Sequence, residues 1–273
     1  MAARRRPAKN CTMQQRISTP PPQQTWLWLA PYIAIGVFAL AMLILTGLLQ
    51  WRELDTARSA LEGDMHWAER TIETRLQAHR DFLAELGREQ EFKQLTYESF
   101  QVRAARYVRE APEIQAIIWV DTDGKVEWVA PNEGTLTFVG DQLVGNRWSA
   151  LQEALRIRRE LVSPDYRDGT LGPMHDIILP VQRSSADLGA FIAVQSLESL
   201  LRTTLPAVFT ARYSLTVVNA ENREVFSNSS VKPTDRQLSG LINLELPNNR
   251  LGLNIVAYRA GGAWLTFLPA ALI

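Results

Sequence analysis

The chain has 273 residues with 29 basic and 29 acidic side chains, and 46% of its residues are hydrophobic. Five of the basic residues lie within the first 25, so the remainder carries 24 basic against 29 acidic side chains, a net charge of about −5 that argues against a nucleic-acid-binding surface. The only cysteine, Cys11, excludes a disulfide framework, so the folded part must be stabilised by a packed core.

The first 49 residues predict a cytoplasmic tail followed by a membrane-spanning helix. Residues 1–25 contain five cations and no acidic residue, and they are too poor in apolar side chains to fold. The uncharged segment from Trp26 to Leu49 would rise roughly 36 Å as a helix, which exceeds the hydrocarbon core of about 30 Å. The basic tail places the N-terminus in the cytoplasm and the rest of the chain outside. A cleaved secretory signal is the alternative, but the apolar run exceeds the usual signal core of about 7–15 residues.

A second apolar run begins at Ala263 and continues to Ile273. It is too short to cross a bilayer. We therefore expect residues 263–273 to be the start of a second transmembrane helix, and the chain to be truncated within it. On this interpretation the output part of the protein lies beyond residue 273.

Residues Trp51 to Arg88 are predicted to form one long helix that continues directly from the membrane span. The segment contains no proline, and its apolar residues recur at steps of three, four and seven. These residues are Leu54, Leu61, Met65, Ala68, Ile72, Leu76, Leu83 and Leu86. Their stripe is wide enough for both the domain core and a parallel partner, which predicts a homodimer. His66 and His79 lie too far apart along the helix to ligate one metal, and no metal or cofactor is expected.

Beyond the long helix the apolar pattern alternates between helical and strand periods. Helices are predicted at Tyr97–Arg109, Trp148–Glu160 and Leu197–Leu205, and a polar loop at Asp165–Pro173. Strands are predicted at Ile114–Val120, Val126–Ala130, Glu160–Ser163, His175–Val181, Gly189–Gln195, Tyr213–Val218, Glu224–Ser227, Ile242–Leu246 and Leu251–Tyr258. The predicted fold class is α+β, with two small antiparallel sheets that follow the long helix.

Two hairpins in these sheets share one local pattern. Asp121, Gly124 and Trp128 of the first hairpin correspond to Asn219, Asn222 and Phe226 of the second, 98 positions later. Asn tolerates the left-handed backbone conformation that Gly adopts freely, so the exchange at the turn is physically sensible. We interpret this as a weak internal repeat, with chance similarity of two hairpins as the alternative.

The segment Pro112–Val120, preceded by a helix that carries Phe100, resembles the pattern of CHASE-type extracytoplasmic sensor domains. The segments Leu179–Arg183, Leu200–Pro206 and Arg212–Leu215 resemble the sensor regions of proteobacterial histidine kinases of the C4-dicarboxylate-sensing group. The resemblance covers most of residues 52–259, through loose motifs made mainly of apolar positions.

The resemblance implies two stacked PAS-like units in the periplasm of a bacterium whose inner membrane holds the anchor. Residues 50–205 would hold the long helix and a membrane-distal sensor unit, and residues 206–260 a membrane-proximal unit. It also implies a kinase region, but the sequence contains no phospho-acceptor motif and no ATP-binding box.

A ligand site is expected in the membrane-distal unit, at Tyr166, Arg167, His175 and Asp176. Arg167 could hold a carboxylate with two hydrogen bonds, and His175 or Tyr166 could add a third. A solvated loop pair between Arg167 and Asp165 is the alternative.

Trp119 and Trp128 could form a wall of the pocket, although core packing is the other interpretation. No nucleophile elbow, P-loop or dinucleotide motif occurs, so no catalytic residue is assigned. The sequence therefore predicts the input region of a receptor, most simply a sensor histidine kinase that binds a small ligand such as a carboxylate. The input region of a diguanylate cyclase or chemotaxis receptor, or a ligand-free structural or partner-binding ectodomain, remain alternatives.

Overall fold

The computed structural model describes residues 24–132, 137–168, 172–184, 186–229 and 238–258. The chain divides into two compact units, Met1–Thr56 and Ala57–Ile273. Helix α1 (Gln24–Glu91) is continuous, as the sequence predicted for the membrane span and the helix after it. The predicted tail and the second apolar run, residues 263–273, lie outside the described residues.

Part of α1 meets the requirements of a membrane span. Among the described residues, one segment, Pro31–Leu49, is long and apolar enough to cross a bilayer, with a mean hydropathy of 2.4. Its large apolar side chains are exposed, for example Phe38 and Leu43 at 66% and 70%. No described residue of this unit covers the surface, and a hydrocarbon environment would remove it from water.

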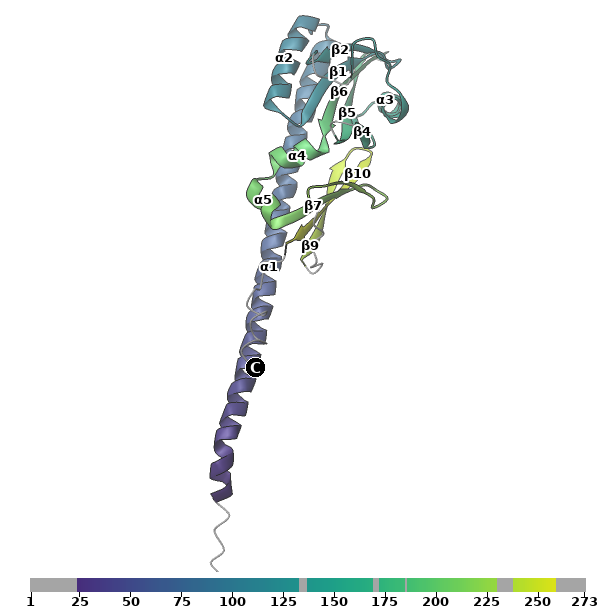
Figure 1. The fold of residues 1–273 in the computed structure, drawn as a ribbon. Helices are drawn as coiled ribbons and strands as arrows, with labels where there is room; N and C mark the ends of the chain where they lie inside the picture. The colour runs from purple at the N-terminus through teal and green to yellow at the C-terminus, as the bar shows by residue number, and fades with distance from the viewer. Residues whose placement is uncertain (1–23, 133–136, 169–171, 185, 230–237, 259–273) are drawn as a thin grey trace, which may run out of the picture. The chain divides into compact units, whose positions relative to one another are not determined.

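The first sheet of the second unit is antiparallel, with strand order β2-β1-β6-β5-β3 and β4 paired to β5 (Figure 1). Its strands are β1 (Ile114–Val120), β2 (Val126–Ala130), β3 (Leu161–Val162), β4 (Tyr166–Asp168), β5 (Gly172–Arg183) and β6 (Ala186–Ser196). Helix α2 (Tyr97–Glu110) precedes β1, and α3 (Gly145–Ile157) lies between β2 and β3. Strand β4 falls in the predicted polar loop, because its pairing with β5 comes from tertiary structure and not from its own sequence pattern.

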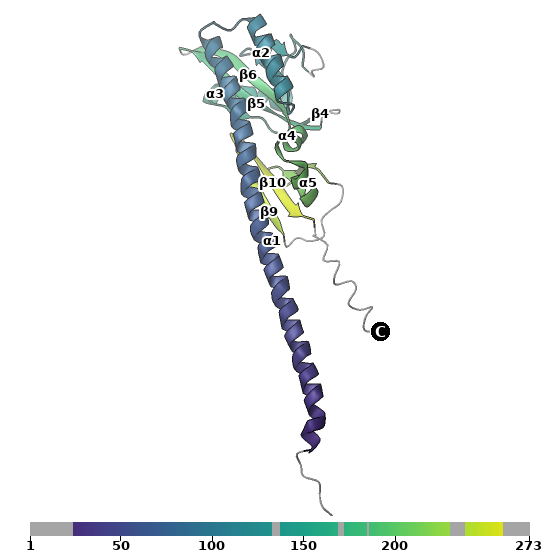
Figure 2. The same cartoon turned by 90° about the vertical axis from the view of Figure 1, so that its left-hand side faces the viewer.

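Both faces of this sheet are covered, which explains why β1 is apolar on both sides. Ile117 and Trp119 belong to the core cluster that contains residues of α1 and α2. Ile118 and Val120 belong to the cluster that contains residues of α3. Figures 1 and 2 show α1 and α2 along one face and α3 on the other. A residue's position in a strand therefore decides which of the two cores it joins.

The second sheet is antiparallel, with order β8-β7-β10-β9. Its strands are β7 (Tyr213–Val218), β8 (Glu224–Ser227), β9 (Ser239–Leu246) and β10 (Asn249–Ala257). Helices α4 (Leu197–Thr204) and α5 (Ala207–Arg212) connect the two sheets. Helix α5 was not predicted from the sequence, because it is only six residues long. The predicted division of the chain at residues 205 and 206 falls in this connection.

The two hairpins predicted to be related have the same backbone hydrogen bonds. Asp121 Oδ1 accepts from the backbone N–H groups of residues 123 and 125, and Asn219 Oδ1 accepts from those of residues 221 and 223. Gly124 and Asn222 adopt φ angles of +81° and +57°. Both hairpins contain a register shift just before the turn. The internal similarity of the hairpins is therefore confirmed at the level of backbone geometry.

The apolar stripe of α1 packs into the core of its own unit. The described members of the predicted stripe are buried there, apart from Met65, which is partly buried against the same core. They are Leu61, Ala68, Ile72, Leu76, Leu83 and Leu86. Within residues 57–91 the stripe consequently offers no apolar surface to a partner helix. The exposed side of α1 is mainly polar, at Arg70 and Gln77 for example, although Trp67 is also exposed there.

Candidate ligand-binding site

A buried carboxylate on β5 is the centre of a polar cluster on the α3 side of the first sheet. Asp176 has no exposed surface. Its Oδ1 accepts a hydrogen bond from the hydroxyl of Tyr166 at 2.7 Å, and its Oδ2 accepts one from Nε of Arg147 at 2.6 Å. Two of the predicted site residues, Tyr166 and Asp176, are thus brought together, with an arginine that was not predicted from the sequence.

Arg147 lies in the first turn of α3, and its side chain is 19% exposed. Its guanidinium lies 5.3 Å from the centre of the Tyr166 ring, and Nη1 donates to Oγ1 of Thr137 at 3.3 Å. Burial would lower the pKa of Arg147, but the charges of Asp176 and Tyr166 and the hydrogen bond to Asp176 raise it above its ordinary value. The Nη2 group is buried and has no hydrogen-bond partner within the described part of the chain. A buried donor without a partner is costly, so this N–H group is suited to an incoming acceptor.

The backbone around Asp176 is fixed by a short strand. Its N–H donates to Oγ of Ser163 at 2.9 Å, while its carbonyl oxygen accepts from the N–H of Ser163 at 2.9 Å. Tyr166 pairs with Met174 in the β4–β5 ladder, which brings its ring beside Asp176. The position of the carboxylate is therefore set by backbone contacts that do not depend on ligand.

His175 lies on the opposite face of the sheet from Asp176, because successive residues of a strand point to opposite sides. It is fully buried, and its Nε2 donates to Oε1 of Gln195 at 2.7 Å across the β5–β6 pair. Burial, as the largest cause, lowers the pKa of His175 against the opposing effects of Gln195 and Asp176. The structure does not bring His175 together with Tyr166 and Asp176.

Trp119 and Trp128 lie in an aromatic cluster of the α1 and α2 core. The Trp119 ring centre is 4.6 Å from that of Phe191, and the Trp128 ring centre is 5.5 Å from that of Phe100. Trp119 is only 5% exposed. Of the two interpretations made from the sequence, the structure favours core packing, on the face of the sheet that does not carry Asp176.

Arg167 follows Tyr166 on β4 and contacts the second sheet. Its Nη2 donates to the backbone carbonyl of Val225 on β8 at 2.9 Å. Its predicted role as the cation that holds a ligand carboxylate stays a prediction. Arg147, not Arg167, is the arginine beside Asp176.

The sequence did contain one signal for Arg147. A cation in the first turn of a helix opposes the helix dipole, which favours acidic residues there. Helix α3 has no acidic residue in its first turn. Its partner Asp176 is 29 positions away, so the pair itself could not be found from spacing.

A second buried polar cluster joins α1 to the start of β1. Oε1 of Glu113, which is fully buried, accepts from Nε of Arg75 and lies 3.0 Å from Nε2 of His79. The other ring nitrogen of His79 is 2.7 Å from the Tyr107 hydroxyl, and Thr203 donates to Oε2 of Glu113 at 3.3 Å. Burial would raise the pKa of Glu113, but the hydrogen bonds from His79 and then Arg75 lower it to about 2.

No family model matches the sequence, and no curated protein matches it. Solved structures resemble it in fold. One is the ligand-binding domain of the amino acid chemoreceptor PctC of Pseudomonas aeruginosa PAO1, in complex with GABA. That match has a TM-score of 0.54 and 13% sequence identity, and it covers 73% of this chain and 99% of the PctC chain.

Two further structures give similar values. The extracellular domain assigned to the histidine kinase vpHK1S-Z8 matches with a TM-score of 0.53 and 13% identity, over 75% of this chain and 94% of the other. The ligand-binding domain of the Campylobacter jejuni chemoreceptor Tlp3, in complex with 4-methylisoleucine, matches with a TM-score of 0.50 and 14% identity, over 75% and 91%. The chain therefore has the α+β fold of double-PAS-like extracellular ligand-binding domains: a long helix with two antiparallel sheets.

Proposed function

We propose that this chain is the extracytoplasmic sensor region of a membrane-anchored bacterial receptor, and that it binds a small ligand at Arg147, Tyr166 and Asp176. The observation that carries the proposal is the buried Nη2 group of Arg147, which lacks a partner among the described residues and lies in a cluster with a buried carboxylate. The apolar segment Pro31–Leu49 and the sensor fold support the membrane anchor and the periplasmic location.

The charges of the cluster favour a zwitterionic ligand such as an amino acid. Arg147 can donate to a ligand carboxylate, and Asp176 can accept from a ligand ammonium group. A dicarboxylate would bring two negative charges next to Asp176 with a single cation to balance them, which is unfavourable in a buried site. We therefore place amino acids ahead of the C4-dicarboxylates that the sequence resemblance suggested.

We propose a sensor histidine kinase as the parent protein, with a chemoreceptor or diguanylate cyclase as alternatives. The fold does not separate these, since the matched domains come from both a chemoreceptor and a histidine kinase. A phosphotransfer assay on a chain extended beyond residue 273 tests this choice, and ATP-independent output would exclude a kinase.

We further propose that ligand shifts the receptor between two states through β5. Asp176 contacts Arg147 and Tyr166 on one face of the sheet, and His175 lies on the other face, towards the core that contains α1. Movement of β5 therefore changes the packing on both faces of the sheet. Helix α1 then carries the change, as one continuous helix from Gln24 to Glu91. A ligand can shift such an equilibrium only by its difference in affinity for the two states.

A homodimer through α1 stays a prediction. Because the apolar stripe is used by the core of its own unit, a partner helix would have to pack on the exposed side of α1, which is mainly polar. A Gln77→Cys variant tests this contact, because Gln77 is exposed on that face. Disulfide cross-linking in membranes is expected for a dimer along α1. Failure to cross-link, together with a monomer in detergent, would reject it.

The binding proposal is tested on the full chain in detergent by calorimetry and thermal unfolding with the common amino acids and with succinate and fumarate. Ligand at about 100 times its dissociation constant stabilises by about 2.7 kcal/mol. For a unit of this size we expect the midpoint temperature to rise by about 5–10 °C. Arg147→Gln should remove this rise, while Arg156→Gln, an exposed arginine of the same helix, should keep it. Binding that survives Arg147→Gln would reject the site.

A further inference from the structure

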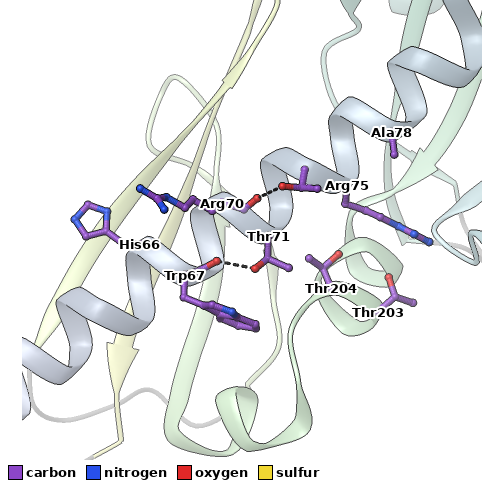
Figure 3. A pocket seen from close by; sticks show the side chains of 9 residues that line it. His66, Trp67, Arg70, Thr71, Arg75, Ala78, Thr203 and Thr204 are labelled. Atoms are coloured by element: carbon purple, nitrogen blue, oxygen red, sulfur yellow. Dashed lines mark hydrogen bonds between the residues drawn. The ribbon is translucent and has the colours of Figure 1, made fainter.

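A groove runs along α1 beside the end of α4. It lies on the opposite side of the first sheet from the cluster of Arg147, Tyr166 and Asp176, which is called the Arg147 cluster below. Its volume is about 790 Å³, which is within the range of small-molecule sites. Figure 3 shows the side chains that line it, from α1 and from the last residues of α4. The lining residues are His66, Trp67, Arg70, Thr71, Thr74, Arg75, Ala78, Thr203 and Thr204.

The lining combines positive charge with an exposed aromatic ring. It contains two arginines and a histidine, and none of the lining residues is acidic. Trp67 is 45% exposed, although its ring also lies 6.1 Å from that of Phe209. An exposed indole beside cationic side chains suits a ligand with an aromatic ring at one end and a negative charge at the other.

The hydrogen-bonding capacity of the groove also favours an acceptor. The hydroxyls of Thr71 and Thr74 donate to the carbonyl oxygens of Trp67 and Arg70, each at 2.7 Å, so they have no proton left to donate. Thr204 is different, because its hydroxyl oxygen is buried without a hydrogen-bond partner in the described structure. It is therefore available to donate to a bound anion.

Arg75 is one of the two arginines that line the groove together with Thr204. Its Nε donates to Glu113 and its Nη2 donates to the carbonyl oxygen of Glu110 at 3.3 Å, which leaves Nη1 for the groove. Figure 3 shows Arg75 reaching over Thr203 and Thr204, with the Trp67 ring on the same side of α1. The guanidinium is held in place by Glu113, so little side-chain freedom is lost when an anion binds.

We infer that this groove is a second binding site, for a small aromatic carboxylate whose carboxylate contacts Arg75 and Thr204 and whose ring packs on Trp67. The site is separate from the Arg147 cluster, and the inference does not rest on the proposed function. Because Arg75 also holds Glu113, a ligand here acts directly on the contact between α1 and the start of β1.

The test uses 3-phenylpropionate as the probe, with calorimetry on the full chain in detergent. The neutral alcohol 3-phenylpropan-1-ol and the ringless anion propionate are the matched control ligands. We expect binding of 3-phenylpropionate in the millimolar range or tighter, and at least about tenfold weaker binding of either control. No binding of 3-phenylpropionate up to about 10 mM, or equal binding of the alcohol, overturns the inference.

Variants locate the bound probe. Thr204→Val removes the hydroxyl at nearly constant volume and should weaken binding at least about fivefold, and Trp67→Leu at least about tenfold. Arg88→Gln, an exposed arginine of the same helix outside the groove, should change affinity less than about twofold. Thermal unfolding of each variant verifies that it is folded.

Three results overturn the assignment even if the probe binds. The first is unchanged affinity in both Thr204→Val and Trp67→Leu. The second is loss of binding in Arg147→Gln, which would place the probe in the first site. The third is a change of oligomeric state in Trp67→Leu without a change in affinity. The last result would show that a second copy of the chain covers this surface.

Discussion

Replacing Asp176 by asparagine is the sharpest test of the polar cluster on β5. The substitution keeps the size of the side chain and leaves an acceptor for the Tyr166 hydroxyl, but it removes the charge that Arg147 faces. Arg147 would then be a largely buried cation without a counter-ion. The variant should therefore be clearly less stable than the native chain.

The size of the loss follows from the burial of the two partners. Breaking a fully buried ion pair costs about 3–5 kcal/mol. Because the side chain of Arg147 is 19% exposed, we expect a value near the lower end, about 3 kcal/mol. For a unit of this size the midpoint of thermal unfolding should fall by about 6–12 °C.

A double-mutant cycle separates the ion pair from other effects of the substitution. The assay is thermal and denaturant unfolding of the full chain in detergent, for Asp176→Asn, Arg147→Met and the double variant. The double variant should be more stable than the sum of the single effects implies, by at least about 2 kcal/mol. Glu153→Gln, which breaks an exposed pair on α3, is the control and should change stability by less than about 1 kcal/mol. Single effects that add within about 0.5 kcal/mol would refute the coupling of Arg147 and Asp176.

Three further predictions test separate parts of the structure. Gly189→Ala should destabilise the fold by several kcal/mol, because φ is +137° and the new Cβ would lie 2.1 Å from the carbonyl oxygen of Val120. Gly63→Ala is the control: with open space around it, it should stabilise α1 by up to about 1 kcal/mol. Unfolding measurements that change stability in the same direction for both variants contradict this prediction. The pKa of Glu113 is about 2 in the folded protein against an ordinary 4.5, so its contribution to the free energy of unfolding is fully present above pH 4.5 and is lost as the pH falls towards 2. Glu113→Gln should therefore make the free energy of unfolding less dependent on pH between 4.5 and 2. The same pH dependence in the variant and the native chain would contradict the assignment. Arg167→Ala should reduce ligand affinity far less than Arg147→Gln, because Arg167 already donates to the carbonyl oxygen of Val225. If calorimetry gives an equal loss of affinity in both variants, Arg167 also binds the ligand.

The hairpins show why some features could be predicted from the sequence. Their turns are stabilised by side-chain oxygens of Asp121 and Asn219 that accept from N–H groups two and four residues later. Every contact that defines the turn lies within five residues, so the local sequence contains the whole pattern. The same holds for α1, whose apolar period extends over many turns.

The candidate site was only partly predicted because its geometry is non-local. Strand β4 is three residues long and exists through its pairing with β5, so the sequence pattern alone indicated a loop. His175 and Asp176 were grouped because they are adjacent, although a strand sends them to opposite sides. Arg147 was missed because α3 and β5 meet only in the folded chain.

The pair His175 and Asp176 has one more implication. A single peptide bond separates the carboxylate of Asp176, on one face of the first sheet, from the imidazole of His175 on the other face, and both side chains are fully buried. Reorientation of that peptide plane by a few degrees would move both side chains at once, without any opening of the sheet. Such a change needs no hinge, and the backbone traces before and after it would be nearly superimposable.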